Sequence, residues 1–135
     1  MQKTTTFLMF VGEKAGQAEE AMRFYTSLFK DSGIKSMTKY QADEQGGKKG
    51  MVKHAVFGLQ GQEYMAIDST APHQFTFTPS ISIFVQCEDE AEIDDLYKKL
   101  SEAGRELMPL GNYGFSRKFG WVNDRYGVSW QMNLQ

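Results

Sequence analysis

Gln131 is the side chain of this sequence that is best placed for a binding role. It lies in the C-terminal stretch 129–134, where polar and apolar residues alternate as they do in a half-buried β-strand. The alternation puts Trp130, Met132 and Leu134 on one face and puts Ser129, Gln131 and Asn133 on the other. Gln131 therefore points away from Trp130, toward whatever the sheet encloses.

Other side chains with useful chemistry are scattered. Cys87 shares a strand face with apolar neighbours, so we expect a buried, inert thiol. His54 lies on a strand and His73 follows Pro72 in a linker, and we interpret both as histidines without a metal-binding role.

Three carboxylates, Glu63, Asp68 and Asp124, are candidate general bases by residue type. Carboxylates at turns and strand ends are usually structural or solvated. We expect Asp124 to accept hydrogen bonds from the backbone amides of its own turn. Arg117 and Lys118 are candidates for attracting an anionic ligand, although such a pair is more often a solvated part of a loop.

Composition narrows the functional classes. With 135 residues and 41% hydrophobic content, the chain suits one globular domain, residues 1–135. A net charge of −2 with scattered Lys and Arg argues against binding to nucleic acid or an anionic membrane. One cysteine, no long apolar run and no signal-peptide pattern indicate a cytoplasmic protein.

The first half of the chain predicts the order βαβββ. An amphipathic helix is expected over 17–29, and a polar, glycine-rich, mobile loop over 42–50. Strands are expected at 4–11, 36–40, 51–59 and 63–68, the last two joined by a tight turn at 60–62. An irregular linker follows at 69–79.

The second half repeats this order. Asp89 with Glu92 forms a capping box at the start of a helix that Gly104 ends. Strands are expected at 80–87, with Ile81, Ile83, Val85 and Cys87 on one face, and at 105–110, 119–123 and 129–134, with a loop at 111–114.

The halves align by residue. Val56 and Gly61 match Val122 and Gly127 at identical spacing, which places Met65 where the second half has Gln131. Chance matches of this length also occur in unrelated α+β chains. The expected fold class is α+β, with two βαβββ modules at 4–69 and 80–134.

Three segments resemble a known family. They are FLMF at 7–10, AEEAMRFYTSLF at 18–29 and FGWVNDRYGVSWQ at 119–131. These strings are similar to the PhnB-type branch of the glyoxalase/bleomycin-resistance/dihydroxybiphenyl dioxygenase superfamily, the vicinal oxygen chelate proteins. The branch is often labelled 3-demethylubiquinone-9 3-methyltransferase. The segment at 12–16 is a few residues longer than the usual turn before the helix.

The resemblance implies curled mixed sheets around a cavity, commonly completed as a homodimer. In metal-dependent relatives, strand side chains hold a divalent metal that receives two substrate oxygens. The matching positions here are Thr5 or Phe7, Met65, Ser80 or Ser82, and Gln131. Only Gln131 has a suitable side chain, and one neutral amide cannot hold such a metal against water. We therefore expect no bound catalytic metal and no cofactor.

The lining of such a cavity suits a flat, partly polar small molecule. The candidate ligand contacts are Phe7, Met65, Phe84, Tyr113, Trp121 and Gln131, with Tyr113 and Trp121 expected to overhang the site. A filled core is the alternative interpretation of the inward Phe and Met residues.

Three functions follow from this interpretation. The favoured function is metal-free binding of a small molecule. One alternative is a metal-dependent lyase, isomerase or dioxygenase whose metal uses Gln131 and groups of a partner subunit. The other is the methyltransferase of the family label, but the glycine pair Gly46 and Gly47 lacks the preceding buried strand of a nucleotide-binding turn.

Overall fold

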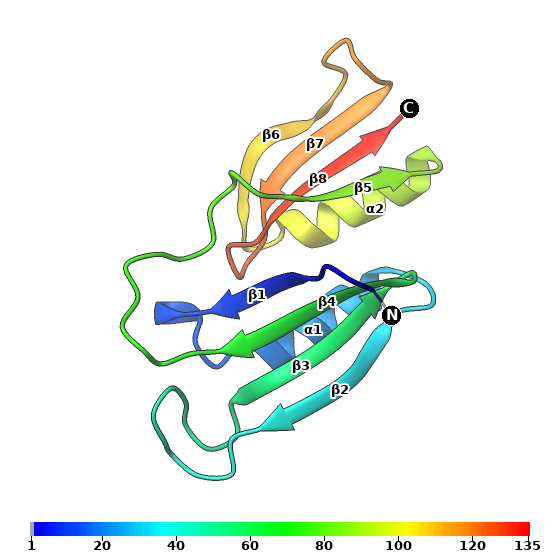
Figure 1. Cartoon of the computed structure of the whole chain (residues 1–135). Helices are drawn as coiled ribbons and strands as arrows, with labels where there is room; N and C mark the ends of the chain where they lie inside the picture. The colour runs from blue at the N-terminus through cyan, green and yellow to red at the C-terminus, as the bar shows by residue number, and fades with distance from the viewer. Residues whose placement is uncertain (1) are drawn as a thin grey trace. The chain divides into compact units, whose positions relative to one another are not determined.

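The computed structural model describes residues 2–135 and contains two α-helices and eight strands in two mixed four-stranded sheets (Figure 1). The chain divides into two compact units, Met1–Thr76 and Phe77–Gln135. Each unit has the order βαβββ, as the sequence predicts. Neither sheet closes on itself.

The first unit is built on a sheet with the strand order β1-β4-β3-β2. Only the β1–β4 pair is parallel. Its elements are β1 (Thr6–Phe10), a short 3-10 helix η1 (Gly12–Lys14), α1 (Ala18–Leu28), β2 (Gly33–Lys39), β3 (Val52–Leu59) and β4 (Gln62–Asp68).

The second unit has the equivalent strand order, β5-β8-β7-β6, and again only its first pair is parallel. Its elements are β5 (Ile83–Cys87), α2 (Glu90–Ser101), β6 (Arg105–Gly111), β7 (Lys118–Asn123) and β8 (Ser129–Leu134). Asp89 caps α2 as predicted, since its side chain accepts a hydrogen bond from the amide of Glu92 at 2.8 Å.

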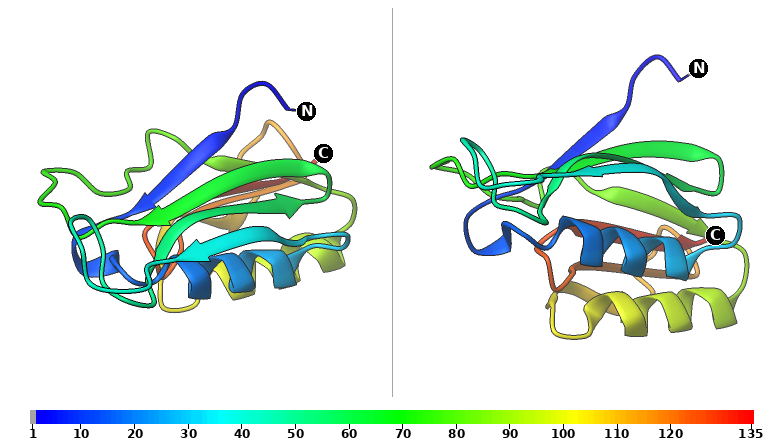
Figure 2. Two further views of the ribbon diagram at one scale, coloured as in Figure 1. Left: turned by 60° about the horizontal axis from the view of Figure 1, so that its bottom comes forward. Right: turned by 90° about the horizontal axis from the view of Figure 1, so that it is seen from below.

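Each helix covers one face of its own sheet (Figure 2). The apolar stripe of α1, which includes Met22 and Tyr25, is buried with Phe57 of β3. In the second unit Ile93 of α2 and Trp130 of β8 are fully buried. Burial of such side chains contributes about 2 kcal/mol each. We call the sheet face opposite the helix the open face of that unit.

Asp68 anchors the first unit. Its carboxylate is 1% exposed and accepts hydrogen bonds from the backbone amides of Gly16 (2.8 Å), Ala18 (3.1 Å) and Val52 (2.9 Å). The amides of Gly16 and Ala18 belong to the start of α1, so a residue at the end of β4 caps that helix. The start of α1 is thus capped by a carboxylate that is remote in sequence, whereas the start of α2 is capped by the adjacent Asp89.

The two β-hairpin turns differ in length. Gln60 and Gly61 connect β3 to β4 with φ angles of 46° and 88°, which is the two-residue geometry that suits the twist of a hairpin. Five residues, 124–128, connect β7 to β8. The extra residues shift the alignment of the halves, because Met65 pairs with Val56 whereas Gln131 pairs with Trp121.

The predicted match of Val56 with Val122 is therefore wrong by one residue. Val122 is fully buried on the helix side, and the strand pairings make Trp121 the counterpart of Val56. The pairings do make Met65 and Gln131 equivalent, since each lies between the first and third strand of its module.

The predicted loop at 42–50 connects β2 to β3, and backbone hydrogen bonds join Glu44 to Gly47 and the amide of Thr70 to the carbonyl of Gly46. One local prediction differs from the structure. The strand expected from residue 80 begins only at Ile83. Ile81, outside the strand, is 69% exposed rather than on an apolar strand face.

No helix within residues 2–135 has the length and apolar character needed to cross a membrane.

Candidate functional site

A row of four side-chain positions crosses the open face of the second unit. The strand pairings place Phe84 of β5 beside Gln131 of β8, Gln131 beside Trp121 of β7, and Trp121 beside Met108 of β6. Three of the residues predicted to contact a ligand, Phe84, Trp121 and Gln131, are thus neighbours. We call these four positions the Gln131 row.

Hydrogen bonds fix the polar part of this row. The indole Nε1 of Trp121 donates to Ser129 Oγ at 2.8 Å, and Gln131 Nε2 donates to Ser82 Oγ at 3.2 Å. The two hydroxyl oxygens are 2.7 Å apart and hydrogen-bonded to each other. The network holds the indole and the amide in one orientation, while Phe84 remains 56% exposed.

Two amide oxygens on the same face lack a partner. Asn123 Oδ1 and Asn133 Oδ1 are buried and make no hydrogen bond within the described part of the chain. Asn123 is paired with Ser129 on one side of the Gln131 row, and Asn133 is paired with Phe119 on the other side. A buried acceptor without a donor is costly, so both oxygens favour an external donor such as water or a ligand.

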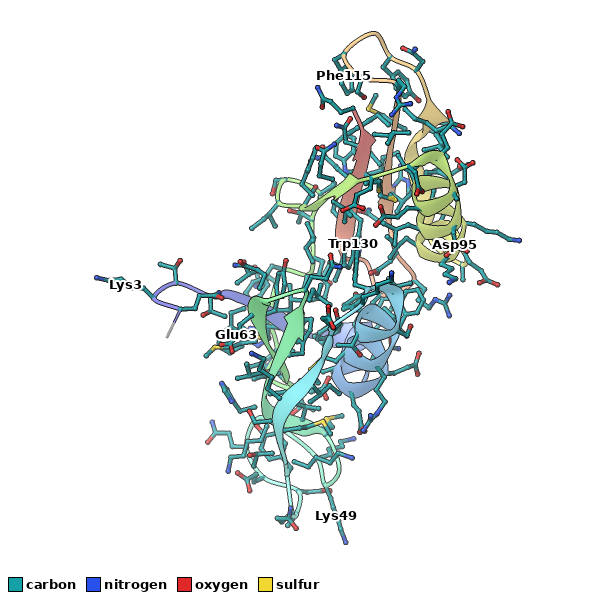
Figure 3. The ribbon with its side chains drawn as sticks, turned by 90° about the vertical axis from the view of Figure 1, so that its right-hand side faces the viewer. Lys3, Lys49, Glu63, Asp95, Phe115 and Trp130 are labelled. Atoms are coloured by element: carbon teal, nitrogen blue, oxygen red, sulfur yellow. The ribbon has the colours of Figure 1, made fainter. Side chains whose placement is uncertain are left out.

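Tyr113 lies in the β6–β7 loop, whose tip carries Phe115 (Figure 3). Its ring is stacked with that of Phe115 at 6.4 Å and edge-on to Phe119 at 6.3 Å. Its hydroxyl donates to the carbonyl of Pro109. Tyr113 therefore covers Phe119, on the open face beside the row. Trp121 lies in β7, within the strand predicted at 119–123, and reaches the open face from the terminal hairpin.

The equivalent row of the first unit has different chemistry. Phe7 pairs with Met65, Met65 with Val56, and Val56 with Ser36. The ring of Phe7 is 52% exposed and lies edge-on to His54 at 6.4 Å. The structure thus places Phe7 and Met65 side by side, as the sequence suggested for the family's positions, on a face that is mainly apolar.

The positions that hold a metal in related proteins do not fit one here. Phe7 and Met65 offer a phenyl ring and a thioether, Ser82 offers a hydroxyl, and Gln131, whose amide nitrogen donates to Ser82, offers one neutral amide oxygen. Divalent metals of the first transition row prefer imidazole and carboxylate groups. Among residues 2–135, no three His, Cys, Asp or Glu side chains are grouped to hold a metal ion.

The start of α1 does not offer a nucleotide-binding turn either. Gly12 and Gly16 flank this connection with positive φ angles, 58° and 94°, between a strand and a helix. The amides of Gly16 and Ala18, which would face a phosphate or carboxylate, are already bonded to Asp68.

The remaining candidates are structural. Asp124 Oδ1 accepts from the amides of Tyr126 (2.8 Å) and Val128 (3.1 Å), which confirms the predicted role in its turn. Its Oδ2 also accepts from the indole of Trp130 at 2.8 Å, a contact that the sequence did not indicate. Burial raises the pKa of the Cys87 thiol to about 12, so this thiol stays protonated.

Lys118, one of the basic pair near Tyr113, faces the helix side of the sheet. Lys118 Nζ is 2.7 Å from Asp94 and 3.5 Å from Glu90, both on α2. The Nε of Arg117 donates to the carbonyl of Gln135 at 2.8 Å. The idea that this pair attracts an anionic ligand is therefore wrong for Lys118, because its charge is neutralised on the helix side.

Ser82, Ser129, Asn123 and Asn133 are the site residues that sequence reasoning missed or left unused. The alternation of 129–134 places Ser129 and Asn133 with Gln131, so their strand face was available from the sequence. Their hydrogen bonds to β5 and β7 depend on strand pairing, which a single sequence does not reveal.

Comparison with known proteins agrees with this fold. The family model described as 3-demethylubiquinone-9 3-methyltransferase matches residues 2–133. The chain is 57% identical to a PhnB protein from Bacillus cereus, with a TM-score of 0.93 over 99% of this chain and 100% of that one. The search of curated proteins gives no match.

More distant structures share the fold alone. One is a glyoxylase/bleomycin resistance protein/dioxygenase domain from a Frankia species, with 13% identity and a TM-score of 0.64 over 99% of this chain and 97% of that one. Another is the fosfomycin resistance protein FosX from Listeria monocytogenes, with 10% identity and a TM-score of 0.61 over 100% and 95%. The chain belongs to the PhnB-type family described as 3-demethylubiquinone-9 3-methyltransferase, and it shares the fold of the glyoxylase/bleomycin resistance protein/dioxygenase domain.

Proposed function

We propose that this protein binds a small, flat, partly polar molecule on the open face of its second unit, without a catalytic metal. The observation that carries the proposal is the Gln131 row, in which an indole and an amide are held by hydrogen bonds beside an exposed phenyl ring. A packed core rarely needs such a polar network on the sheet face opposite its helix, whereas a binding site needs a few fixed polar groups among aromatic walls.

Two orphaned acceptors guide the choice of ligand. The oxygens Asn123 Oδ1 and Asn133 Oδ1 are buried without a donor, and a turn of either amide toward the open face would present its oxygen to a ligand, so the proposed ligand class is an aromatic molecule that carries hydroxyl or N–H groups. Stacking on Trp121 and contact with Phe84 supply apolar area, and aromatic pairs add about 1 kcal/mol beyond that area. A hydroquinone, a phenol or an aromatic amide has this combination.

Three further contacts belong to the proposal. Tyr113 borders the same face through Phe119, and Phe7 with Met65 provides a second apolar surface on the open face of the first unit. We also propose that the protein is a homodimer and is cytoplasmic. Light scattering of the purified chain measures its molar mass and therefore tests the homodimer directly.

The two tryptophans give a matched pair of reporters. The indole N–H of Trp121 donates to Ser129, and that of Trp130 donates to buried Asp124 on the helix side. We propose to titrate the 15N-labelled chain with phenol, benzamide and 2,3-dimethoxy-5-methylhydroquinone under reducing conditions. The Trp121 signal is expected to shift saturably, and the Trp130 signal to stay in place.

Substitutions locate the site. Gln131→Ala and Phe84→Ala are expected to weaken binding about tenfold, the loss of one hydrogen bond or one aromatic contact. Phe75→Ala is the control, because Phe75 is as exposed (58%) but lies in the other unit. Equal shifts of both indoles, or binding that Phe75→Ala weakens equally, would contradict the proposal.

The metal-dependent alternative makes a different prediction. One tightly held Mn, Fe, Ni, Co or Zn ion per chain after dialysis, lost in Gln131→Ala, would replace the binding function by a vicinal oxygen chelate enzyme.

The methyltransferase of the family description is the third candidate, and the family match is what favours it. Transfer of a methyl group from S-adenosylmethionine to a demethylated benzohydroquinone, followed by mass spectrometry, tests it. Methylated product at a rate that falls in Trp121→Phe would establish catalysis at the Gln131 row. Its absence, together with saturable binding of the hydroquinone, supports the binding function.

A further inference from the structure

A separate pocket of about 530 Å³ lies in the first unit, away from the open-face rows. Three segments form it: the connection before α1, the β2–β3 loop and the chain after β4. The lining residues are Gly12, Ala15, Lys48, Met51, Thr70, Ala71, Pro72 and His73. Its volume is within the range of about 300–1,000 Å³ that is typical of small-molecule sites.

Hydrogen bonds between and within these segments hold the pocket in shape. The amide of Thr70 donates to the carbonyl of Gly46 at 3.0 Å and ties the chain after β4 to the β2–β3 loop. The amide of Met51 donates to the carbonyl of Lys48 at 3.0 Å, and that of Ala15 donates to Gly12 at 3.1 Å. The longer connection at 12–16 thus forms a wall of the pocket rather than a loose insertion.

The charged side chain of the lining is Lys48, a cation. The lining also contains His73, and it contains no carboxylate. The ammonium group of Lys48 makes no ion pair within residues 2–135, whereas Lys53 is paired with Glu44 at 3.4 Å. Asp68, the nearest carboxylate in sequence to His73, has its oxygens occupied by three backbone amides.

The imidazole of His73 is held in a fixed position. Its Nε2 lies 3.1 Å from the hydroxyl of Ser69, which also accepts a hydrogen bond from the amide of Ala71 at 3.3 Å. Its ring centroid is 4.8 Å from that of Phe75. A fixed imidazole, an unpaired ammonium and the Thr70 hydroxyl therefore border walls made by Met51, Ala71 and Pro72.

From this arrangement we infer a second binding site, for a small organic anion with a carboxylate or phosphate group and a short apolar part. Lys48 and His73 bind the anionic group, Thr70 donates a hydrogen bond to it, and the apolar walls contact the rest of the molecule. The site is independent of the open face of the second unit, since the pocket draws every lining residue from the first.

The two histidines of the chain allow a direct test by NMR. His73 lines the pocket, and His54, on β3 beside Phe7, is an internal control. We propose to titrate the full chain with phenyl phosphate, benzoate, inorganic phosphate and the neutral benzyl alcohol. Phenyl phosphate or benzoate is expected to shift the His73 ring signals saturably and to leave the His54 signals in place. The anion that binds with the lower Kd shows whether the site prefers a phosphate or a carboxylate group.

Adjacent lysines provide the matched variants. Lys48→Gln is expected to raise the Kd about tenfold, the loss of one charge-assisted contact. Lys49→Gln, at the tip of the same loop (Figure 3), is expected to change it less than about twofold. His73→Gln removes the observed ring, so its binding is measured from the amide signals of Thr70 and Ala71.

Three outcomes would overturn the inference. They are no saturable shift of His73 with either aromatic anion, equal losses in Lys48→Gln and Lys49→Gln, and binding of benzyl alcohol as tight as that of phenyl phosphate. The second would indicate diffuse attraction to a basic loop, and the third a purely apolar surface.

Discussion

The two units have the same strand order and the same pairing partners, but the central row of the open face differs between them. In the first unit the row is Phe7, Met65, Val56 and Ser36, and in the second it is Phe84, Gln131, Trp121 and Met108. One βαβββ backbone thus carries an apolar surface in one unit and a hydrogen-bonded polar surface in the other. The chemistry depends on the side chains placed on the strands and not on the fold.

Buried carboxylates show a second difference between the units. Asp68 joins the start of α1 and the start of β3 to the end of β4, across 16 to 52 positions of sequence. Asp124 accepts three hydrogen bonds from donors within six positions. The first unit therefore depends on a long-range polar anchor, and the second on local ones.

The largest expected effect tests this difference between anchors. Asp68→Ala leaves three amides in separate segments without an acceptor and is expected to lower the free energy of unfolding by about 4 kcal/mol. Asp124→Ala is expected to cost about 3 kcal/mol, because its short turn can rearrange. Urea unfolding followed by circular dichroism measures both. Asp95→Ala, at an exposed position, is the control. A larger loss of unfolding free energy in Asp124→Ala than in Asp68→Ala would contradict the expected order.

Ser129→Ala tests whether the polar row of the second unit is a network. The substitution removes the acceptor of the Trp121 indole and the partner of Ser82, and is expected to cost about 2 kcal/mol. Ser36→Ala, in the row of the first unit, is the matched change. Urea midpoints of the two variants give the comparison, and equal losses would show that Ser129 contributes no more than an isolated hydroxyl.

The helix starts provide a smaller test. Asp89→Ala removes the local cap of α2 and is expected to cost about 1 kcal/mol. Gln17→Ala, at the corresponding position of α1, is expected to change stability by less than about 0.5 kcal/mol, since its side chain makes no capping bond. Thermal unfolding of both variants measures the two losses. Equal losses would mean that Gln17 caps α1 locally, as Asp89 caps α2.

A reciprocal exchange has the smallest effect on stability. Met65→Gln places an amide among Phe7 and Val56 and is expected to cost about 0.5 kcal/mol. Gln131→Met keeps the bond between Ser82 and Ser129 and is expected to be neutral for stability within about 0.5 kcal/mol, while it weakens ligand binding about tenfold. If Gln131→Met retained binding, the amide would have no part in recognition.

Much of the fold could be predicted from the sequence because its signals are local. The stripe of Ala21, Met22 and Tyr25 and the capping box at Asp89 fix the helices, and both formed where expected. The turn role of Asp124 also follows from a motif of a few residues. A predicted strand boundary was wrong where the alternation of apolar and polar residues continued beyond the residues that pair with a neighbouring strand. Ile81 is the example, because it belongs to the alternation but lies outside β5.

What could not be predicted depends on distant partners. Nothing in the local pattern of Asp68 indicates that it caps a helix 50 positions away. The indole bond of Trp121 requires the five-residue turn at 124–128, which sets the register of β7 against β8. The pocket beside His73 is formed by three separate segments, so no single stretch of sequence predicts it.

Both tryptophans of the chain, Trp121 and Trp130, lie in the second unit, and the first unit has tyrosines but no tryptophan. Indole fluorescence therefore follows the loss of structure in one half of the chain, while far-ultraviolet circular dichroism follows both halves. Coincident transitions would mean that the halves unfold as one cooperative body. Separate transitions would mean that each half is a folding unit with a stability of its own.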